Sequence, residues 1–309
     1  MKVLIELPTW LGDTVMTTPA IENLISHFGD VEITLIGSYT SIETLKNHPN
    51  VVKIYEMDKQ YSFFRKFLKE LGKFDSFFSF RSSWRSTIFK FLVKSHNKYQ
   101  FSKYIYQNQH QVEKYNSFIN DSLGKNFSAS NLKIYKSDKF NTYTSKKIVG
   151  INPGASYGSA KQWSPHEFAK VATKLSSKYE IIIFGGVNEV DVASDIEKIL
   201  IRQGVFNYQN LVAKTSIEEL IHLISTLSLF ITGDSGPMHL AASFKVPTVS
   251  IFGPTKFLET SQWLNEKSAI VKKNLNCQPC MKRECPLKHH DCMRLIKADE
   301  VLEAINSFQ

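Results

Sequence analysis

Short apolar runs of strand length alternate with longer amphipathic segments along the chain. This alternation predicts βαβ units and mostly parallel sheets, because parallel strands are joined by crossovers that usually contain a helix. From Tyr61 to Leu123 the pattern predicts mainly helix, with one strand near Ser76–Phe80 and poorly determined boundaries. The other predicted strands are Lys2–Leu7, Glu32–Gly37, Val51–Tyr55, Ile148–Asn152, Glu180–Phe184, Leu229–Thr232 and Thr248–Phe252.

The polar, weakly periodic segment Lys136–Lys147 interrupts this pattern. A chain of 309 residues is long enough for two domains, each with its own core. We therefore predict two α/β domains, 1–145 and 146–309, with ligands bound beyond the carboxyl ends of their strands. In the second domain, Ser164 and Glu167 have the spacing of a capping box, which predicts that a helix begins directly after Ser164.

The composition, with 42% apolar and 22% charged residues, is that of a globular protein. No apolar run approaches the roughly 20 residues that span a bilayer, and the opening residues predict a buried strand rather than a signal peptide. We therefore expect a cytoplasmic protein. The whole chain has a net charge of +9, and between Lys59 and Lys114 many basic residues lie among aromatic ones. Such a surface suits an anionic membrane, a phosphorylated substrate or nucleic acid, and the alternative is solvated helix faces over an aromatic core.

Two common nucleotide-binding motifs, G-x-G-x-x-G and G-x-x-x-x-G-K-[ST], do not occur in the chain, which weakens dehydrogenase and P-loop NTPase interpretations. The segment Gly233–Gly236 (GDSG) superficially resembles the nucleophile segment of trypsin-like proteases, but alternating strands and helices exclude that all-β fold. The longer segment Gly233–His239 predicts a tight turn that feeds a helix, whose N–H groups and partial positive charge suit a diphosphate. The alternative is an ordinary turn capped by Asp234 or Ser235. The loop Asn152–Lys161 repeats this arrangement and ends in a cation.

The four cysteines have the spacing C-x₂-C-x₄-C-x₆-C, with His289 and His290 between the last two. Cysteine and histidine at such spacings suit a structural zinc ion, which they bind tetrahedrally. The alternative, which we favour, is a compact loop without a metal, packed near the cleft between the domains. Its thiols should be reduced, because disulfides are rare in the cytoplasm. The histidines outside these motifs are interpreted as structural: His27, His48, His96, His110, His166 and His222.

Several segments together resemble one family: Leu7–Thr14 (LPTWLGDT), Asn152–Ala155 (NPGA), Lys161–Trp163 (KQW) and Gly233–Ala241 (GDSGPMHLA). In these segments the chain resembles the bacterial heptosyltransferases of the lipopolysaccharide core, glycosyltransferase family 9. The resemblance covers nearly the whole chain and is weakest over Tyr61–Ser145. The cysteine segment is most similar to that of the enzymes that add the second heptose.

The resemblance implies a GT-B fold, in which two Rossmann-like domains face each other across a cleft and bind the acceptor and the donor respectively. It implies an inverting glycosyltransferase that needs no metal or other cofactor and moves L-glycero-D-manno-heptose from ADP-heptose to the first heptose of the inner core. The lipid A–Kdo–heptose acceptor lies at the inner membrane surface, which implies a cytoplasmic protein with peripheral membrane contact and no nucleic-acid partner. The alternatives are another core step or sugar within the family, or a non-catalytic basic protein that binds nucleic acid or membranes.

Matching positions imply the site residues. Asp13 matches the catalytic base, and Lys161 matches the phosphate-binding lysine. The alternative role of Asp13 is to cap the helix predicted to follow the Gly12-Asp13 turn. The implied donor-binding residues are Asn152, Gly154, Lys161, Glu189, Asp234, Ser235, Gly236, Met238 and His239, with Glu189 at the ribose. The proposed acceptor-binding residues are Thr9, Trp10, Gly12, Arg81, Ser83 and Arg85; Arg81, Ser83 and Arg85 follow a predicted strand end, where arginine suits phosphates or carboxylates and a plain surface role is the alternative.

Overall fold

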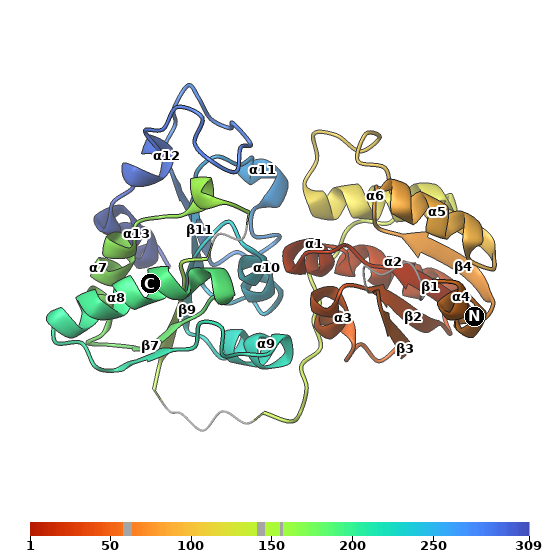
Figure 1. The fold of residues 1–309 in the computed structure, drawn as a ribbon, viewed down its shortest axis with the longest axis horizontal. Coiled ribbons are helices and arrows are strands. Elements are labelled where there is room, and N and C mark those ends of the chain that lie inside the picture. The colour runs from red at the N-terminus through yellow and green to blue at the C-terminus, as the bar shows by residue number, and fades with distance from the viewer. Residues whose placement is uncertain (58–63, 141–145, 155–156, 309) are drawn as a thin grey trace. The chain divides into compact units, whose positions relative to one another are not determined.

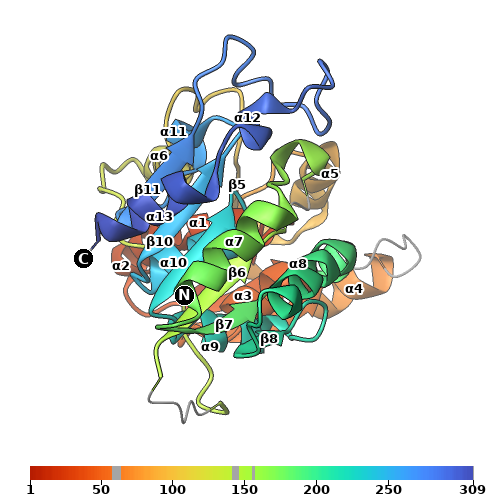
Figure 2. The ribbon, with the colours of Figure 1, turned by 90° about the vertical axis from the view of Figure 1, so that its left-hand side faces the viewer.

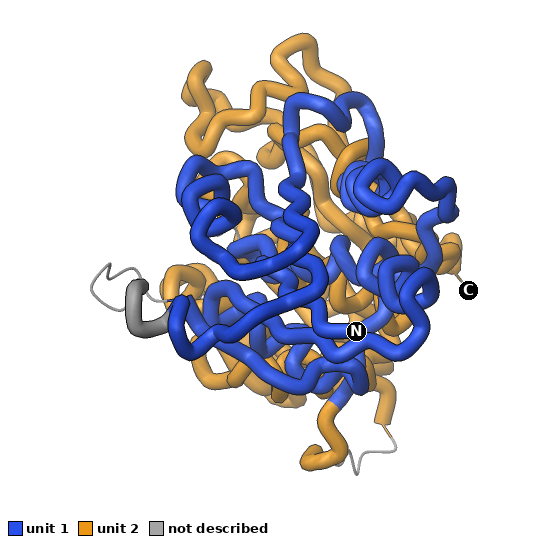
Figure 3. Tube along the Cα trace, turned by 90° about the vertical axis from the view of Figure 1, so that its right-hand side faces the viewer, with its two compact units in different colours: residues 1–136 blue, residues 137–309 orange. Residues whose placement is uncertain are grey.

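The computed structural model describes residues 1–57, 64–140, 146–154 and 157–308. For residues 64–67 it describes the backbone alone. The chain divides into two compact units, Met1–Lys136 and Ser137–Gln309, each built around one parallel sheet (Figures 1 and 3). The division lies at the start of the predicted joining segment, Lys136–Lys147, and before the predicted boundary at residue 145.

Unit 1 contains, in its described part, five parallel strands in the order β3-β2-β1-β4-β5. Its elements are β1 (Lys2–Glu6), α1 (Leu11–Met16), α2 (Thr18–Phe28), β2 (Glu32–Gly37), α3 (Tyr39–Leu45), β3 (Val51–Glu56), α4 (Phe64–Leu71), β4 (Phe74–Ser79), α5 (Trp84–Leu92), β5 (Ser95–Gln100) and α6 (Gln111–Leu123). Helix α1 packs against α2, α3 and α6, whereas α5 packs against β4 and β5. The central strand β1 is buried from Val3 to Glu6, as expected for a parallel sheet with both faces covered.

Unit 2 contains, among its described residues, six parallel strands in the order β11-β10-β9-β6-β7-β8. Its elements are β6 (Ile148–Asn152), η2 (Ser159–Lys161), α7 (Pro165–Leu175), β7 (Glu180–Ile183), η3 (Val187–Glu189), α8 (Val190–Arg202), β8 (Tyr208–Asn210), α9 (Ile217–Ser225), β9 (Leu229–Gly233), α10 (Gly236–Ser243), β10 (Thr248–Phe252), α11 (Phe257–Thr260), β11 (Ser268–Lys272), α12 (Asp291–Arg294) and α13 (Ala298–Asn306). Helix α7 packs against α8 and α13, and these three lie in front of the sheet in Figure 2, while α9 packs against α10.

Both strand orders place the first strand of the unit beside its fourth, β1 beside β4 and β6 beside β9, which is the Rossmann-like arrangement. The predicted α/β class with parallel sheets is therefore confirmed. The strands that the sequence pattern missed are β5, β8 and β11, and each forms the edge of a sheet. An edge strand buries less of its surface, so β5 (SHNKYQ) carries no apolar run, and its pairing with β4 defines it instead.

The start of α7 differs in detail from the prediction. The helix begins at Pro165 with Ser164 as N-cap, as expected, but the Ser164 side chain makes no capping hydrogen bond among the described residues. Glu167 Oε2 instead accepts a hydrogen bond from the Ala298 backbone N–H at 2.8 Å. The predicted capping box is therefore wrong, because the buried Glu167 carboxylate joins α7 to the start of α13.

The start of α1 also corrects a prediction. The helix begins at Leu11 with Trp10 as N-cap, so Gly12 and Asp13 lie inside it rather than in a turn before it. Asp13 is the third residue of α1, in the first turn, and does not cap the helix. Glycine weakens an isolated helix, but Gly12 is buried here, and tertiary packing outweighs that local cost of roughly 1 kcal/mol. Among the described residues no helix is long and apolar enough to cross a membrane.

Candidate active site

The carboxyl ends of the central strands are the places where ligands bind in sheets of this type. In unit 1 these ends belong to β1 and β4, and in unit 2 to β6 and β9. The residues predicted for the acceptor follow β1 and β4, and the central donor residues follow β6 and β9. Each unit therefore carries its predicted residues at the carboxyl ends of the strands of its own sheet, which we call its binding edge.

Lys161 and Asp234 form an ion pair in unit 2. Lys161 Nζ lies 2.5 Å from Asp234 Oδ2 and 3.3 Å from the Asp234 carbonyl oxygen. Thr255 Oγ1 donates a hydrogen bond to the same Oδ2 at 2.7 Å, and both charged side chains are largely buried. An ammonium has three N–H donors, so two contacts to Asp234 leave one for an oxygen of a ligand. The pair thus holds a cation at the end of β9, beside the start of α10.

One aromatic residue, Tyr157, and one basic residue, Arg283, lie near Lys161 and were not among the predicted site residues. The Lys161 ammonium lies 4.7 Å from the centroid of the Tyr157 ring, and the Arg283 guanidinium lies 5.7 Å from the same ring. Gly158, which follows Tyr157, has a φ of +150° and lies so close to the Arg283 carbonyl that a Cβ at this position would clash with its oxygen. Only glycine fits this approach. No local sequence pattern indicates the contact, because Arg283 is far from Gly158 in the chain.

Asn152 ties the two central loops of unit 2 together. Its buried side-chain amide donates hydrogen bonds to Thr232 Oγ1 at 3.2 Å and to Ser235 Oγ at 3.0 Å. The hydroxyls of Thr232 and Ser235 also share a hydrogen bond of 2.9 Å. These contacts fix the start of the Gly236–Ser243 helix, α10, against the end of β6.

The other predicted donor residues lie nearby but are not equally accessible. Glu189 is buried, and its Oε2 accepts a hydrogen bond from the Gly186 N–H at 2.6 Å, while a Cβ on Gly154 would lie 3.4 Å from the Glu189 carboxyl carbon. Met238 and His239 are buried within α10, and the Met238 N–H already donates to the Ser235 carbonyl. Met238 and His239 therefore shape the loop from behind, whereas Glu189 and Gly154 line the end of β6 and β7.

Asp13 in unit 1 has a partner that is distant in sequence. The Tyr115 side chain, from α6, hydrogen-bonds to both Asp13 and Gln111. Burial raises the pKa of Tyr115 well above its ordinary value, and the negative charge of Asp13 raises it further. The phenol therefore stays protonated and donates its O–H to the Asp13 carboxylate. Local sequence patterns contain no signal for this contact, because it depends on how α6 packs against α1.

A buried carboxylate at the end of β1 organises the neighbouring loop. Glu6 is 1% exposed and accepts hydrogen bonds from Ser79 Oγ at 2.6 Å and from Ser86 Oγ at 2.9 Å, and Arg81 Nη1 lies 3.9 Å from it. Burial raises the pKa of the Glu6 carboxyl despite these hydrogen bonds and the Arg81 charge. Glu6 was not among the predicted residues, and it joins β1 to β4 and α5 at the binding edge.

The remaining predicted acceptor residues surround this edge. Thr9 and Trp10 are exposed in the loop after β1, and the Thr9 carbonyl accepts a hydrogen bond from Ser38 Oγ at 2.9 Å. Ser83 is the N-cap of α5, and its Oγ accepts a hydrogen bond from the Ser86 N–H at 3.2 Å, so this hydroxyl has a structural role. Arg85 is exposed, with its guanidinium 5.6 Å from the centroid of the Trp84 ring.

The four cysteines surround one hollow of about 320 Å³ in unit 2, together with both neighbouring histidines. All four are free thiols, and burial together with the other three raises the pKa of Cys292 to about 11. Among the described residues no group of three or more Cys, His, Asp or Glu side chains is placed to hold a metal ion. The segment does contact the Lys161 loop: the Ala160 N–H donates to the Arg283 carbonyl at 3.0 Å, and His290 Nε2 lies 2.9 Å from the Ala160 carbonyl. It thereby braces the loop that presents Lys161.

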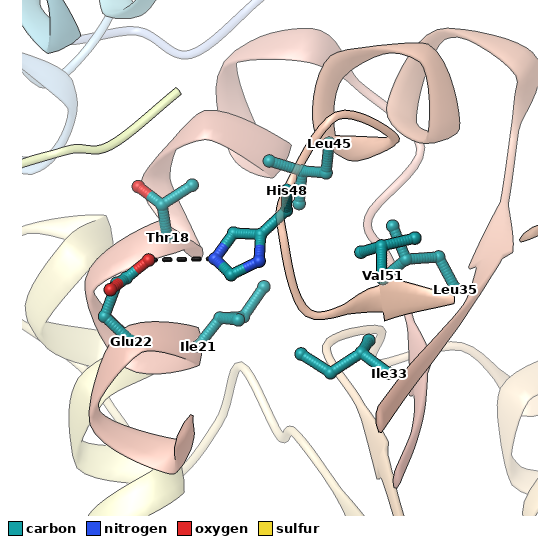
Figure 4. A pocket seen from close by; sticks show the side chains of 8 residues that line it. All are labelled: Thr18, Ile21, Glu22, Ile33, Leu35, Leu45, His48 and Val51. Carbon is teal, nitrogen blue, oxygen red and sulfur yellow. Dashed lines mark hydrogen bonds and ion pairs between the residues drawn. The ribbon is translucent and has the colours of Figure 1, made fainter. Parts of the chain in front are cut away.

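A second hollow, of about 270 Å³, lies in unit 1 near the starts of β2 and β3, away from the carboxyl ends of the strands (Figure 4). His48 beside it contacts Glu22, with Nε2 2.9 Å from Oε1, while the Asn50 N–H donates to His48 Nδ1. Nε2 therefore carries the proton and donates to Glu22. This contact gives His48 a structural role, since it joins α2 to the segment before β3.

Residues 68–290 match the family described as glycosyltransferase family 9 (heptosyltransferase). The chain is 45% identical to lipooligosaccharide heptosyltransferase 2 of Campylobacter jejuni, over 98% of this chain and 97% of that protein. Its fold is similar to that of the E. coli ADP-heptose LPS heptosyltransferase II, with a TM-score of 0.81, 19% identity and coverage of 100% of this chain and 98% of that one. An E. coli heptosyltransferase solved with ADP-2-deoxy-2-fluoro heptose has a TM-score of 0.76 and 14% identity, with 100% of both chains covered. The chain belongs to glycosyltransferase family 9, the heptosyltransferase family, and is a glycosyltransferase with the GT-B type of fold.

Proposed function

We propose that this chain is heptosyltransferase II, which transfers L-glycero-D-manno-heptose from ADP-heptose to the first heptose of the lipopolysaccharide inner core. The support is the 45% identity to a protein named for that step over 98% of the chain, together with an E. coli neighbour whose name includes ADP-heptose. In this assignment the acceptor is lipid A–Kdo–heptose at the cytoplasmic face of the inner membrane. Unit 1 binds the acceptor, and unit 2 binds the donor.

The observation that carries the donor assignment is the Lys161–Asp234 pair at the carboxyl ends of β6 and β9. A diphosphate brings two or more negative charges and many acceptor oxygens. The Lys161 ammonium supplies a charge-assisted donor, and Arg283 supplies a second cation beside the Tyr157 ring. Asp234 keeps Lys161 in place and lowers the net positive charge of the site.

In the proposed reaction the acceptor hydroxyl oxygen attacks the anomeric carbon of the heptose, and the bond from that carbon to the diphosphate oxygen breaks. The hydroxyl proton passes to the Asp13 carboxylate, and the electron pair of the broken bond leaves with ADP. Lys161 and Arg283 stabilise the negative charge that develops on the diphosphate. Attack opposite the leaving group inverts the anomeric configuration.

Tyr115 is then a positioning residue for Asp13. We expect Tyr115→Phe to lower kcat by roughly ten- to a hundredfold, because a hydrogen bond to a charged group contributes about 1.5–3 kcal/mol. The hydrogen bond also favours the ionised carboxylate, so its loss moves the acidic limb of the pH–rate profile to higher pH. The matched control is Tyr106→Phe, which removes a 2.8 Å hydrogen bond to Asp121 in the same unit. A Tyr115→Phe enzyme with the rate and pH profile of the Tyr106→Phe enzyme contradicts the positioning role.

The function is tested by acceptor-dependent release of ADP from ADP-heptose. We expect release with a Kdo acceptor that already carries one heptose, and little with the same acceptor lacking heptose. If ADP is released only with the heptose-free acceptor, the chain adds the first heptose of the core instead of the second. No release with any core acceptor would refute heptose transfer to the core.

A further inference from the structure

Helix α5 of unit 1 carries an apolar stripe that the protein leaves exposed. With 3.6 residues per turn, positions i, i+4, i+7 and i+8 share one face of a helix. On α5 these positions are exposed by 61%, 45%, 74% and 48%, and they are Trp84, Ile88, Phe91 and Leu92. Ser86 and Phe89 on the other side are buried against the sheet. A helix with one apolar face against its own core needs no second apolar face for stability.

The neighbouring loop extends this stripe. Tyr104 and Ile105 are 72% and 69% exposed. The loop is held beside the start of α5, because the Lys103 N–H donates to Ser82 Oγ at 3.4 Å, and Gln100 Nε2 donates to the Ser83 carbonyl at 3.3 Å. We name the six exposed side chains of α5 and this loop, Trp84, Ile88, Phe91, Leu92, Tyr104 and Ile105, the α5 surface.

Basic residues flank the α5 surface and acidic ones are missing from its segment. The sequence contains no Asp or Glu between Asp75 and Glu113. On the helical wheel of α5, Arg85 lies on one side of the stripe and Lys90 lies on the other. Lys94 is exposed and follows directly after Val93, the C-cap of α5. Two further lysines are placed nearby: Lys98 Nζ donates to the Phe91 carbonyl at 3.2 Å, and Lys103 Nζ lies 5.1 Å from the centroid of the Tyr104 ring.

We propose that the α5 surface is the membrane-docking surface of this protein and that its partner is an anionic lipid bilayer. Aromatic and aliphatic side chains insert at the level of the headgroups, and the flanking cations contact anionic lipids. The proposal deepens the proposed function, on which its biological meaning rests. The predicted acceptor residue Arg81 lies beside the start of α5, so docking on this face brings the acceptor edge of unit 1 to the bilayer that holds a lipid-anchored acceptor.

The test is co-sedimentation with vesicles of phosphatidylcholine, with and without phosphatidylglycerol. We expect Phe91→Ser to lower the partition coefficient on anionic vesicles on the order of tenfold, because the substitution removes a large apolar side chain from the interface. The matched control is Phe206→Ser in unit 2, since Phe206 has the same exposed fraction of 74%. We also expect Lys90→Glu combined with Lys94→Glu to abolish the preference for anionic vesicles, whereas Lys174→Glu with Lys178→Glu, on the exposed part of α7 and the loop after it, leaves it unchanged.

Turnover of a water-soluble acceptor without its lipid separates this proposal from the proposed function. We expect both α5 variants to keep the wild-type rate on that acceptor while they lose vesicle binding. Wild-type vesicle binding by Phe91→Ser, or an equal loss in Phe206→Ser, would overturn the docking surface even if turnover is normal. Binding of duplex DNA that depends on Lys90 and Lys94, without binding to anionic vesicles, would overturn it in favour of nucleic acid. Vesicle binding that depends on the α5 surface in an enzyme without heptose transfer would support the surface and refute the function.

Discussion

Asp13→Asn is expected to lower kcat roughly 10²–10⁴-fold, the usual contribution of a positioned general base. Asparagine has almost the same shape and keeps a carbonyl oxygen for the Tyr115 hydrogen bond, but it cannot take the proton of the acceptor hydroxyl. The affinity for ADP-heptose should stay unchanged, because the predicted donor residues lie in unit 2. Steady-state rates of ADP release and donor binding by calorimetry measure the two effects separately.

The control addresses the position of Asp13 in a helix. A carboxylate in the first turn stabilises a helix by about 0.3–1 kcal/mol through the helix dipole, and the Asn variant loses this term. Asp299 occupies the first turn of α13 and is exposed, so Asp299→Asn removes a comparable charge from a helix outside the candidate site. We expect similar thermal stability for the two variants and a large rate loss only for Asp13→Asn. If Asp13→Asn retains most of the activity, Asp13 is not the base.

Lys161→Ala is expected to lower kcat/KM for the donor roughly 10²–10³-fold, comparable to the loss of one preorganised donor at a developing negative charge. In the proposed role the ammonium contacts the diphosphate before and after bond cleavage, so both donor affinity and kcat should fall. Measurement of kcat and of the donor KM in the ADP-release assay tests this. Unchanged values of both would contradict the phosphate-binding role.

Stability must be controlled here, because Lys161 also neutralises the largely buried Asp234. Loss of one partner of a buried pair leaves an uncompensated charge, which destabilises the fold. Lys161→Ala combined with Asp234→Asn removes both charges, so we expect it to regain thermal stability without regaining activity. Lys273→Ala breaks the 2.6 Å pair with Glu300, which is more exposed and outside the candidate site, and should leave the kinetics unchanged.

Much of the fold could be predicted from the sequence. The predicted bounds of β2, β6 and β10 coincide with those observed, because each is buried over nearly its whole length and therefore contains a short, dense apolar run. The edge strands β5 and β8 escaped prediction, because their polar sequences are held by pairing with β4 and β7. The predicted capping box at Ser164 was wrong for a related reason. Glu167 accepts a hydrogen bond from the backbone of Ala298, 131 residues later in the chain.

The sequence by itself determined the α/β class, the family and the placement of Asp13, Lys161 and Asp234 in the segments that follow β1, β6 and β9. These depend on periodicity and on short motifs, which are properties of neighbouring residues. Only the tertiary structure decided that Lys161 pairs with Asp234, 73 residues later, that Tyr115 donates to Asp13, and that Glu6 organises the loop before α5. Such contacts form between side chains that the chain brings together only when its sheets and helices pack, so no local pattern encodes them.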